Sequence, residues 1–93
     1  MIGSGVRRIE PTAQVMLFGS RARGNARPDS DWDVMVLLDD NSKTDKFALS
    51  NAILNLGWNV NEDLSPVVYR QSEWKSKSFT PFYKNVMREK IEL

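Results

Sequence analysis

The chain has 93 residues, which suits one small domain with a single core. Thirteen basic and twelve acidic residues give a net charge of +1, so the chain is not a polycation that coats nucleic acid. Cysteine and histidine are both absent, which excludes disulfide frameworks, Cys/His zinc sites and catalysis by a thiol or an imidazole. Any bound metal would need oxygen ligands, as Mg²⁺, Mn²⁺ and Ca²⁺ do.

Apolar runs and helical spacing divide the chain into alternating elements. Short apolar runs bounded by glycine or turn residues predict strands at residues 14–18, 32–38 and 65–69. Helical spacing predicts helices at residues 6–9, 19–24, 45–56, 71–77 and 81–90. This order predicts an α/β or α+β domain built around a sheet of three to four strands. No apolar run reaches the ~18 residues that cross a membrane, so we expect a cytoplasmic protein without a membrane contact.

Cap residues refine the middle of the chain. Ser42 or Thr44 would cap the helix at residues 45–56, and Gly57 stands where a left-handed residue would end it. Residues 58–60 would then be extended. Pro66 indicates a strand start or an edge position.

The second predicted strand, residues 32–38, is apolar on both faces, which is typical of a central strand covered on both sides. Trp32 points away from its neighbours Asp31 and Asp33, and we expect it in the core. The same expectation applies to Trp58 and Trp74.

Gly19 and Ser20 follow the first predicted strand and open a short helix that Ser20 would cap. Glycine allows a phosphate to approach the backbone closely, and the serine hydroxyl adds a hydrogen-bond donor. Gly-Ser at a strand end therefore suggests a phosphate cradle, with a simple turn as the alternative.

Asp31 and Asp33 stand ten residues later, at the start of the second predicted strand. Alternate residues of a strand share a face, so the two carboxylates would lie side by side and repel each other. A divalent cation such as Mg²⁺ would relieve that repulsion. For an isolated pair, a solvated junction between loop and strand is the alternative.

The cradle and the acidic pair complement each other. Arg21 and Arg23 lie beside Gly19 and Ser20, where they could bind phosphate, whereas the aspartates could hold the metal. A metal–nucleoside triphosphate needs this combination. Solvated charges on a short helix are the alternative for each arginine.

The stretch LFGSRARGNARPDSDWDVMVLL, with Gly19-Ser20, ten residues and then Asp31-x-Asp33, resembles the DNA polymerase β-type nucleotidyltransferases. It is most similar to their minimal members, the MNT proteins often encoded beside HEPN-domain partners. The resemblance implies a single minimal domain over 1–93 with a small mixed sheet flanked by helices. It implies that Gly19, Ser20, Arg21 and Arg23 bind the nucleotide and that Asp31 and Asp33 are catalytic.

The resemblance also implies cofactors, substrate and partners. Two Mg²⁺ ions, with Mn²⁺ as an alternative, would be bound by the two aspartates, and ATP would be the substrate. AMP would pass to a hydroxyl of a protein or RNA acceptor, and a HEPN-type toxin would be the protein partner of an antitoxin. The small size of the domain indicates that a macromolecular acceptor or a second copy completes the cleft.

The family pattern has a third carboxylate on a later strand, and here the sequence departs from it. The matching position falls near Ser65, which is not acidic. Asp63 would share its face if the chain is extended there, and it is our candidate third catalytic residue. Glu62 would point away.

Two other functions stay open. A catalytically impaired nucleotide- or partner-binding module would explain the missing acid. A nucleic-acid-binding domain would use the six basic residues between positions 70 and 90, which outnumber the acids there by four.

Overall fold

Four strands form one mixed sheet in a computed structural model, which describes residues 2–93. Met1, the first residue of the domain predicted over 1–93, lies outside the described residues. The strands are β1 (Gln14–Phe18), β2 (Trp32–Leu38), β3 (Leu64–Arg70) and β4 (Ile91–Glu92), in the spatial order β3-β2-β1-β4. β2 pairs antiparallel with β1 and parallel with β3, and β4 pairs antiparallel with β1. The predicted mixed sheet flanked by helices is confirmed.

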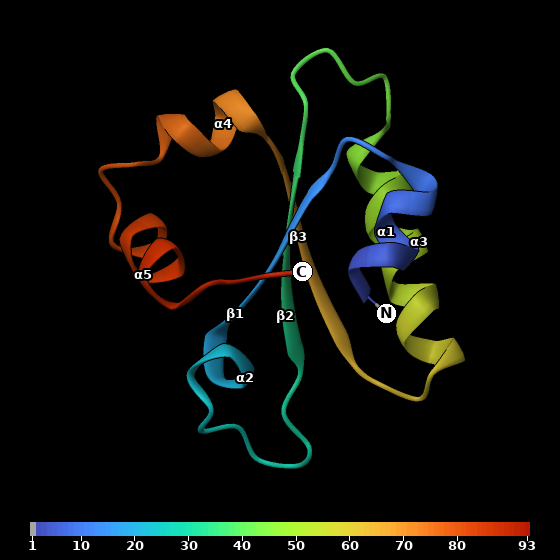
Figure 1. Cartoon of the computed structure of the whole chain (residues 1–93), viewed down its shortest axis with the longest axis vertical. Coiled ribbons are helices and arrows are strands. Elements are labelled where there is room, and N and C mark those ends of the chain that lie inside the picture. Colours follow the sequence, from blue (N-terminus) through green and yellow to red (C-terminus); the bar gives the residue numbers. More distant parts are fainter. Residues whose placement is uncertain (1) are drawn as a thin grey trace.

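Helices cover both faces of the sheet (Figure 1). They are α1 (Ile2–Ile9), α2 (Gly19–Arg23), α3 (Lys46–Asn59), α4 (Gln71–Ser76) and α5 (Pro81–Glu89). α1 and α3 lie on one side, α4 and α5 lie on the other, and α2 follows the end of β1. Throughout residues 2–93, every helix is too short or too polar to span a lipid bilayer.

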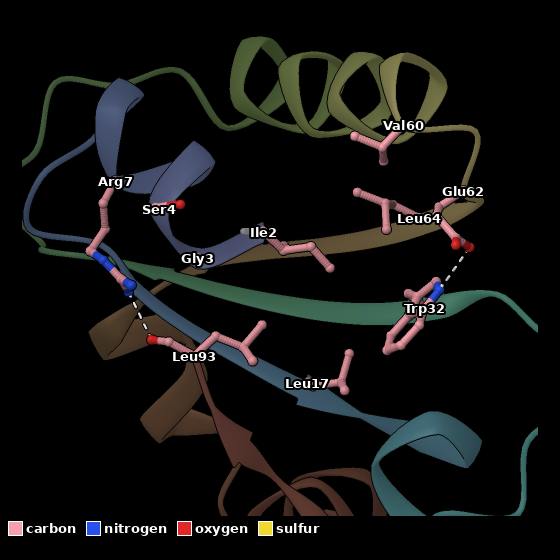
Figure 2. Close-up of a pocket in the computed structure, with 10 residues that line it drawn as sticks. All are labelled: Ile2, Gly3, Ser4, Arg7, Leu17, Trp32, Val60, Glu62, Leu64 and Leu93. Atoms are coloured by element: carbon pink, nitrogen blue, oxygen red, sulfur yellow. Dashed lines mark hydrogen bonds between the residues drawn. The ribbon is translucent and has the colours of Figure 1, made fainter.

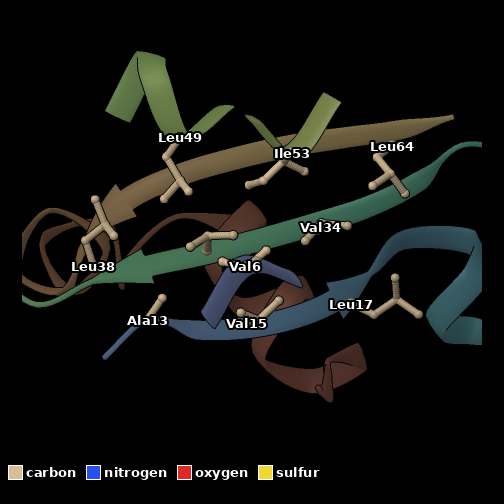
Figure 3. Close-up of a cluster of buried hydrophobic side chains, with 10 residues drawn as sticks. Val6, Ala13, Val15, Leu17, Val34, Leu38, Leu49, Ile53 and Leu64 are labelled. Carbon is tan, nitrogen blue, oxygen red and sulfur yellow. The ribbon is translucent and has the colours of Figure 1, made fainter. Parts of the chain in front are cut away.

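Alternate side chains of β1 and β2 pack into two separate cores, one on each face of the sheet. Figure 3 shows the larger core, where α1 and α3 pack on the sheet through Val6, Leu49 and Ile53. The smaller core, under α4 and α5, includes Met35 and the buried Trp74. Both cores contain residues of β2, which confirms that β2 is covered on both sides.

The α3 boundaries differ from those predicted. Asp45, and neither Ser42 nor Thr44, is the N-cap, and its carboxylate accepts a hydrogen bond of 3.0 Å from the Phe47 N–H. The Ser42 and Thr44 hydroxyls instead donate to Glu10. Glu10, in the loop between α1 and β1, therefore binds the two hydroxyls that would otherwise be available as caps.

Gly57 is helical, and α3 continues past it to Asn59, so the predicted stop and the extended residues 58–60 are wrong. A Cβ at Gly57 would lie 2.6 Å from the Glu62 carbonyl oxygen and 2.9 Å from Leu64. This glycine serves the close approach of the following turn and not the end of the helix. The longer helix carries Trp58 to the surface, where it is 73% exposed, against our core prediction.

Two features at the chain ends were missed. α1 begins at Ile2 and is longer than the predicted turn, because Gly3 and Gly5 allow close packing on Leu93 and Leu56. The two-residue strand β4 pairs with β1 and has no apolar run to predict it.

Candidate functional site

The antiparallel register of β1 and β2 brings the predicted cradle to the predicted acidic pair. Phe18 lies opposite Asp33, so Gly19, the next residue, turns beside the Asp33 carboxylate. Gly19 has a φ of 76°, and a Cβ there would overlap Asp33 Oδ2. Glycine is required both by the left-handed backbone and by this close approach. α2 therefore begins at Gly19, and Ser20 lies within the helix and not at its cap.

The parallel register of β2 and β3 adds a third oxygen-bearing side chain. Ser65 lies opposite Asp33, and its hydroxyl donates a hydrogen bond of 3.1 Å to Asp31 Oδ2. The position that the family pattern fills with an acid thus lies beside both aspartates, and in this chain it holds a serine.

The electrostatics of Asp33 favour a bound cation. Burial, followed by the neighbouring Asp31 carboxylate, raises the pKa of Asp33 above its ordinary 3.8, while Arg23 opposes the shift. Two carboxylates at one site repel each other unless a cation or a proton neutralises part of the charge. Two carboxylates and a hydroxyl are oxygen donors of the kind that Mg²⁺ binds, so the residues fit a divalent ion.

The two candidate arginines of α2 diverge to opposite sides. Arg21 donates hydrogen bonds of 2.8 Å to the Ser30 carbonyl and 3.2 Å to the Pro28 carbonyl, and its guanidinium lies 4.5 Å from the centre of the Trp32 ring. These contacts brace the loop that leads to the aspartates. Arg23 points toward α5, where its guanidinium donates a hydrogen bond to the Glu89 carboxylate.

A pocket of about 370 Å³ lies over the cradle. Gly19, Ser20, Arg23 and Asp33 line one wall of this pocket. The opposite wall is one face of α5, which contributes Phe82, Asn85, Val86 and Glu89. This enclosure combines backbone, cation and carboxylate, as a metal–triphosphate requires.

The residues of α5 were not predicted as part of the site. Asn85 and Glu89 share a helix face at a spacing of four residues, and that face could have been noticed. In the sequence, however, Glu89 reads only as a minor acid in a basic segment.

The structure does not bring Asp63 into a cluster with the aspartate pair. Its carbonyl accepts the Trp32 N–H at 2.8 Å, and the residue is exposed. Within residues 2–93, no three acidic side chains come together in a group that could hold a metal. Glu62 points to the other face of the sheet, where it accepts a hydrogen bond of 3.0 Å from the Trp32 indole.

A larger pocket, of about 440 Å³, lies on the α1 and α3 face (Figure 2). Its walls are mainly apolar, with Ile2, Leu17 and Leu64 directed into it. Its ionic side chains, Arg7 and Glu62, are turned to the Leu93 carbonyl and the Trp32 indole. Its lining has one carboxylate, Glu62, and its glycine, Gly3, packs against Arg7 and Leu93, so the smaller pocket is the better candidate.

Comparisons with known proteins identify the family and the fold. The family model described as a nucleotidyltransferase domain matches residues 2–93. Comparison with curated protein sequences found no significant match.

Two solved structures share the fold. One is a chain from a crystal structure of a toxin–antitoxin with AMP-PNP, with a TM-score of 0.64 and 21% identity over 98% of this chain and 68% of that one. The other is a candidate nucleotidyltransferase from Sulfolobus solfataricus, with a TM-score of 0.60 and 21% identity over 98% of this chain and 71% of that one. The family match over residues 2–93 shows that the chain belongs to the nucleotidyltransferase domain family.

Proposed function

We propose that this nucleotidyltransferase transfers AMP from Mg-ATP to a hydroxyl of a protein or RNA acceptor. The single observation that supports this proposal most is the contact of Gly19 with Asp33, in which a backbone without a Cβ lies against a carboxylate of the acidic pair. The chain also shares its fold with a toxin–antitoxin chain whose structure was determined with AMP-PNP.

Each residue has a defined part in this reaction. The Gly19 backbone and the Ser20 hydroxyl would bind the triphosphate, Arg23 would donate to its oxygens, and Asp31 and Asp33 would hold the divalent ions. When bound, the ions stabilise the charge that develops on the attacking and leaving oxygens. The acceptor oxygen forms a bond to the α-phosphorus, the bond from that phosphorus to pyrophosphate breaks, and the hydroxyl proton passes to solvent.

The proposed setting is an antitoxin whose acceptor is a HEPN-type toxin. The pocket is shallow for a macromolecule, so the acceptor would bring its own surface to the rim that α5 and α2 form. A free RNA acceptor is the alternative within the same chemistry.

Label transfer tests the proposal. ATP labelled at the α-phosphate is incubated with the protein, Mg²⁺ and fractionated cell extract, and acid-stable label is followed in protein and RNA fractions. We expect label with the wild type and at least a hundredfold less with Asp31→Asn, since one carboxylate of the pair is lost. Asp63→Asn is the matched control, because it removes an exposed acid that, within residues 2–93, does not join Asp31 and Asp33 in one group. Equal labelling by wild type and Asp31→Asn would refute the site.

Ser65 favours a second candidate function, a nucleotide-binding module that does not transfer. Its hydroxyl occupies the third position and hydrogen-bonds to Asp31, so that position offers no carboxylate. This module would bind Mg-ATP without turnover. Ser65→Asp separates the two functions, because an added carboxylate should raise transfer in an enzyme that has an acceptor and leave a pure binding module inactive.

A further inference from the structure

The last turn of α5 contacts the arginine of the cradle. Glu89 Oε2 accepts a hydrogen bond of 3.1 Å from Arg23 Nη1. The Glu89 side chain is only 16% exposed, whereas that of Arg23 is 44% exposed. A second arginine, Arg88, approaches the other Glu89 oxygen at 3.8 Å. Glu89 is therefore a sheltered anion that joins α5 to α2 across the candidate pocket.

Arg23 has two carboxylates within its electrostatic reach. It makes an ion pair with Glu89, and it lines the same pocket as Asp33. An arginine that moved onto Asp33 would neutralise a proposed metal ligand and occupy the place of the cation. The position of the Arg23 guanidinium thus decides whether Asp31 and Asp33 are available to bind a cation.

The contact with Glu89 leaves most of the guanidinium available. Arginine has five N–H donors, and across residues 2–93 the hydrogen bond recorded for Arg23 uses one of them. The remaining donors are on a side chain that lines the same pocket as Gly19, Ser20 and Asp33. They could reach phosphate oxygens while the bond to Glu89 stays in place.

We infer that Glu89 is a positioning residue that keeps Arg23 off the Asp33 carboxylate and directed at the triphosphate. Glu89 acts through Arg23 and touches neither the metal nor the reacting phosphorus. This inference rests on the proposed function, because it needs Asp33 to bind a cation and Arg23 to bind phosphate. It makes α5 part of the nucleotide site and not only a cover for the smaller core.

Binding titrations of two ligands test this role without any acceptor. Mn²⁺ alone and ATP in EDTA are titrated separately, by calorimetry, into the wild type, Glu89→Gln, Arg23→Gln and the double variant. We expect Glu89→Gln to weaken Mn²⁺ binding about fivefold, since Arg23 is left uncompensated beside Asp33. The same variant should bind metal-free ATP as tightly as the wild type or about twofold more tightly.

The double variant is the decisive case. If Glu89 acts through Arg23, Arg23→Gln with Glu89→Gln should restore Mn²⁺ affinity to within about twofold of the wild type, because no guanidinium remains to compete. Glu73→Gln is the matched control. It breaks an ion pair with Lys46 at 3.0 Å that lies outside the pocket, and both titrations should be unchanged.

The outcomes separate this inference from the proposed function. A wild type that binds neither Mn²⁺ nor ATP refutes both. A wild type that binds them, with Glu89→Gln unchanged or with Mn²⁺ binding still weakened in the double variant, overturns only the role of Glu89. If the ion pair only held α2 to α5, its loss in Glu89→Gln would lower the free energy of unfolding and weaken the binding of Mn²⁺ and of ATP together. That result would also contradict the inference.

Discussion

The first residue of α2, Gly19, and its C-cap, Gly24, offer a controlled test of the cradle. Gly19 and Gly24 both have left-handed backbones, with φ of 76° and 80°. A Cβ at Gly19 would overlap the Asp33 carboxylate, whereas a Cβ at Gly24 would meet nothing within 4 Å. Replacing each by alanine therefore applies one common strain and one strain that is specific to the site.

The magnitudes follow from these two terms. A left-handed residue with a Cβ costs about 1–2 kcal/mol, so Gly24→Ala should lower the free energy of unfolding by that amount. Gly19→Ala should cost about 1–3 kcal/mol more, because Asp33 must move to relieve the overlap. Small domains have a free energy of unfolding of only about 5–15 kcal/mol, so the difference between the two variants is measurable. Gly19→Ala stays folded if the wild type lies in the upper part of that range.

Urea unfolding followed by tryptophan fluorescence measures the stability term, and calorimetric titration with Mn²⁺ followed by ATP measures the site. We expect Gly19→Ala to bind both at least tenfold more weakly and Gly24→Ala to bind within about twofold of wild type. The reasoning is refuted if the two variants lose the same stability and the same affinity. In that case Gly19 would serve only the turn.

Two further predictions concern pH. Burial, and then Asp31, raises the pKa of Asp33, so the ionised carboxylate destabilises the fold as the pH rises above 3.8. Asp33→Asn should therefore melt at a higher temperature than wild type at pH 7, with the gap narrowing toward pH 4; a lower melting temperature would contradict this. Hydrogen bonds from three hydroxyls, of which Thr44 contributes most, lower the pKa of Glu10 from 4.5 to about 2. Its ionised form stabilises the fold above pH 4.5 and the stabilisation is lost as the pH falls to 2, so Glu10→Gln should be less stable at pH 7, with the deficit closing over that range in urea titrations.

The parts of the fold that could be predicted depend on neighbours in sequence. The apolar run of β2 is long and two-sided, so its central place followed from its composition alone. The contact of Gly19 with Asp33 also follows once β1 and β2 pair antiparallel in the register that puts Phe18 opposite Asp33. These are local constraints, and a single sequence contains them.

The elements that were misjudged depend on contacts that lie outside the local helical or capping pattern. Glu10 takes the hydroxyls of Ser42 and Thr44, more than thirty residues away, and the cap passes to Asp45. Gly57 has no Cβ to clash with the turn that passes over it, and the helical spacing of the sequence does not predict that contact. In both cases a residue suited to a local role is used for a tertiary contact.

The two walls of the candidate pocket differ in the same way. The wall with Gly19 and Asp33 is set by the register of the adjacent strands β1 and β2 and by the glycine at position 19. Glu89, in the other wall, lies more than fifty residues after Asp33, and within residues 2–93 it hydrogen-bonds to the first wall through Arg23 alone. Changes in α5 can therefore alter how Arg23 is held beside the acidic pair without changing the strands that carry Asp33. If the proposed transfer is correct, this second wall is where ligand affinity can be tuned while the motif that identifies the family stays intact.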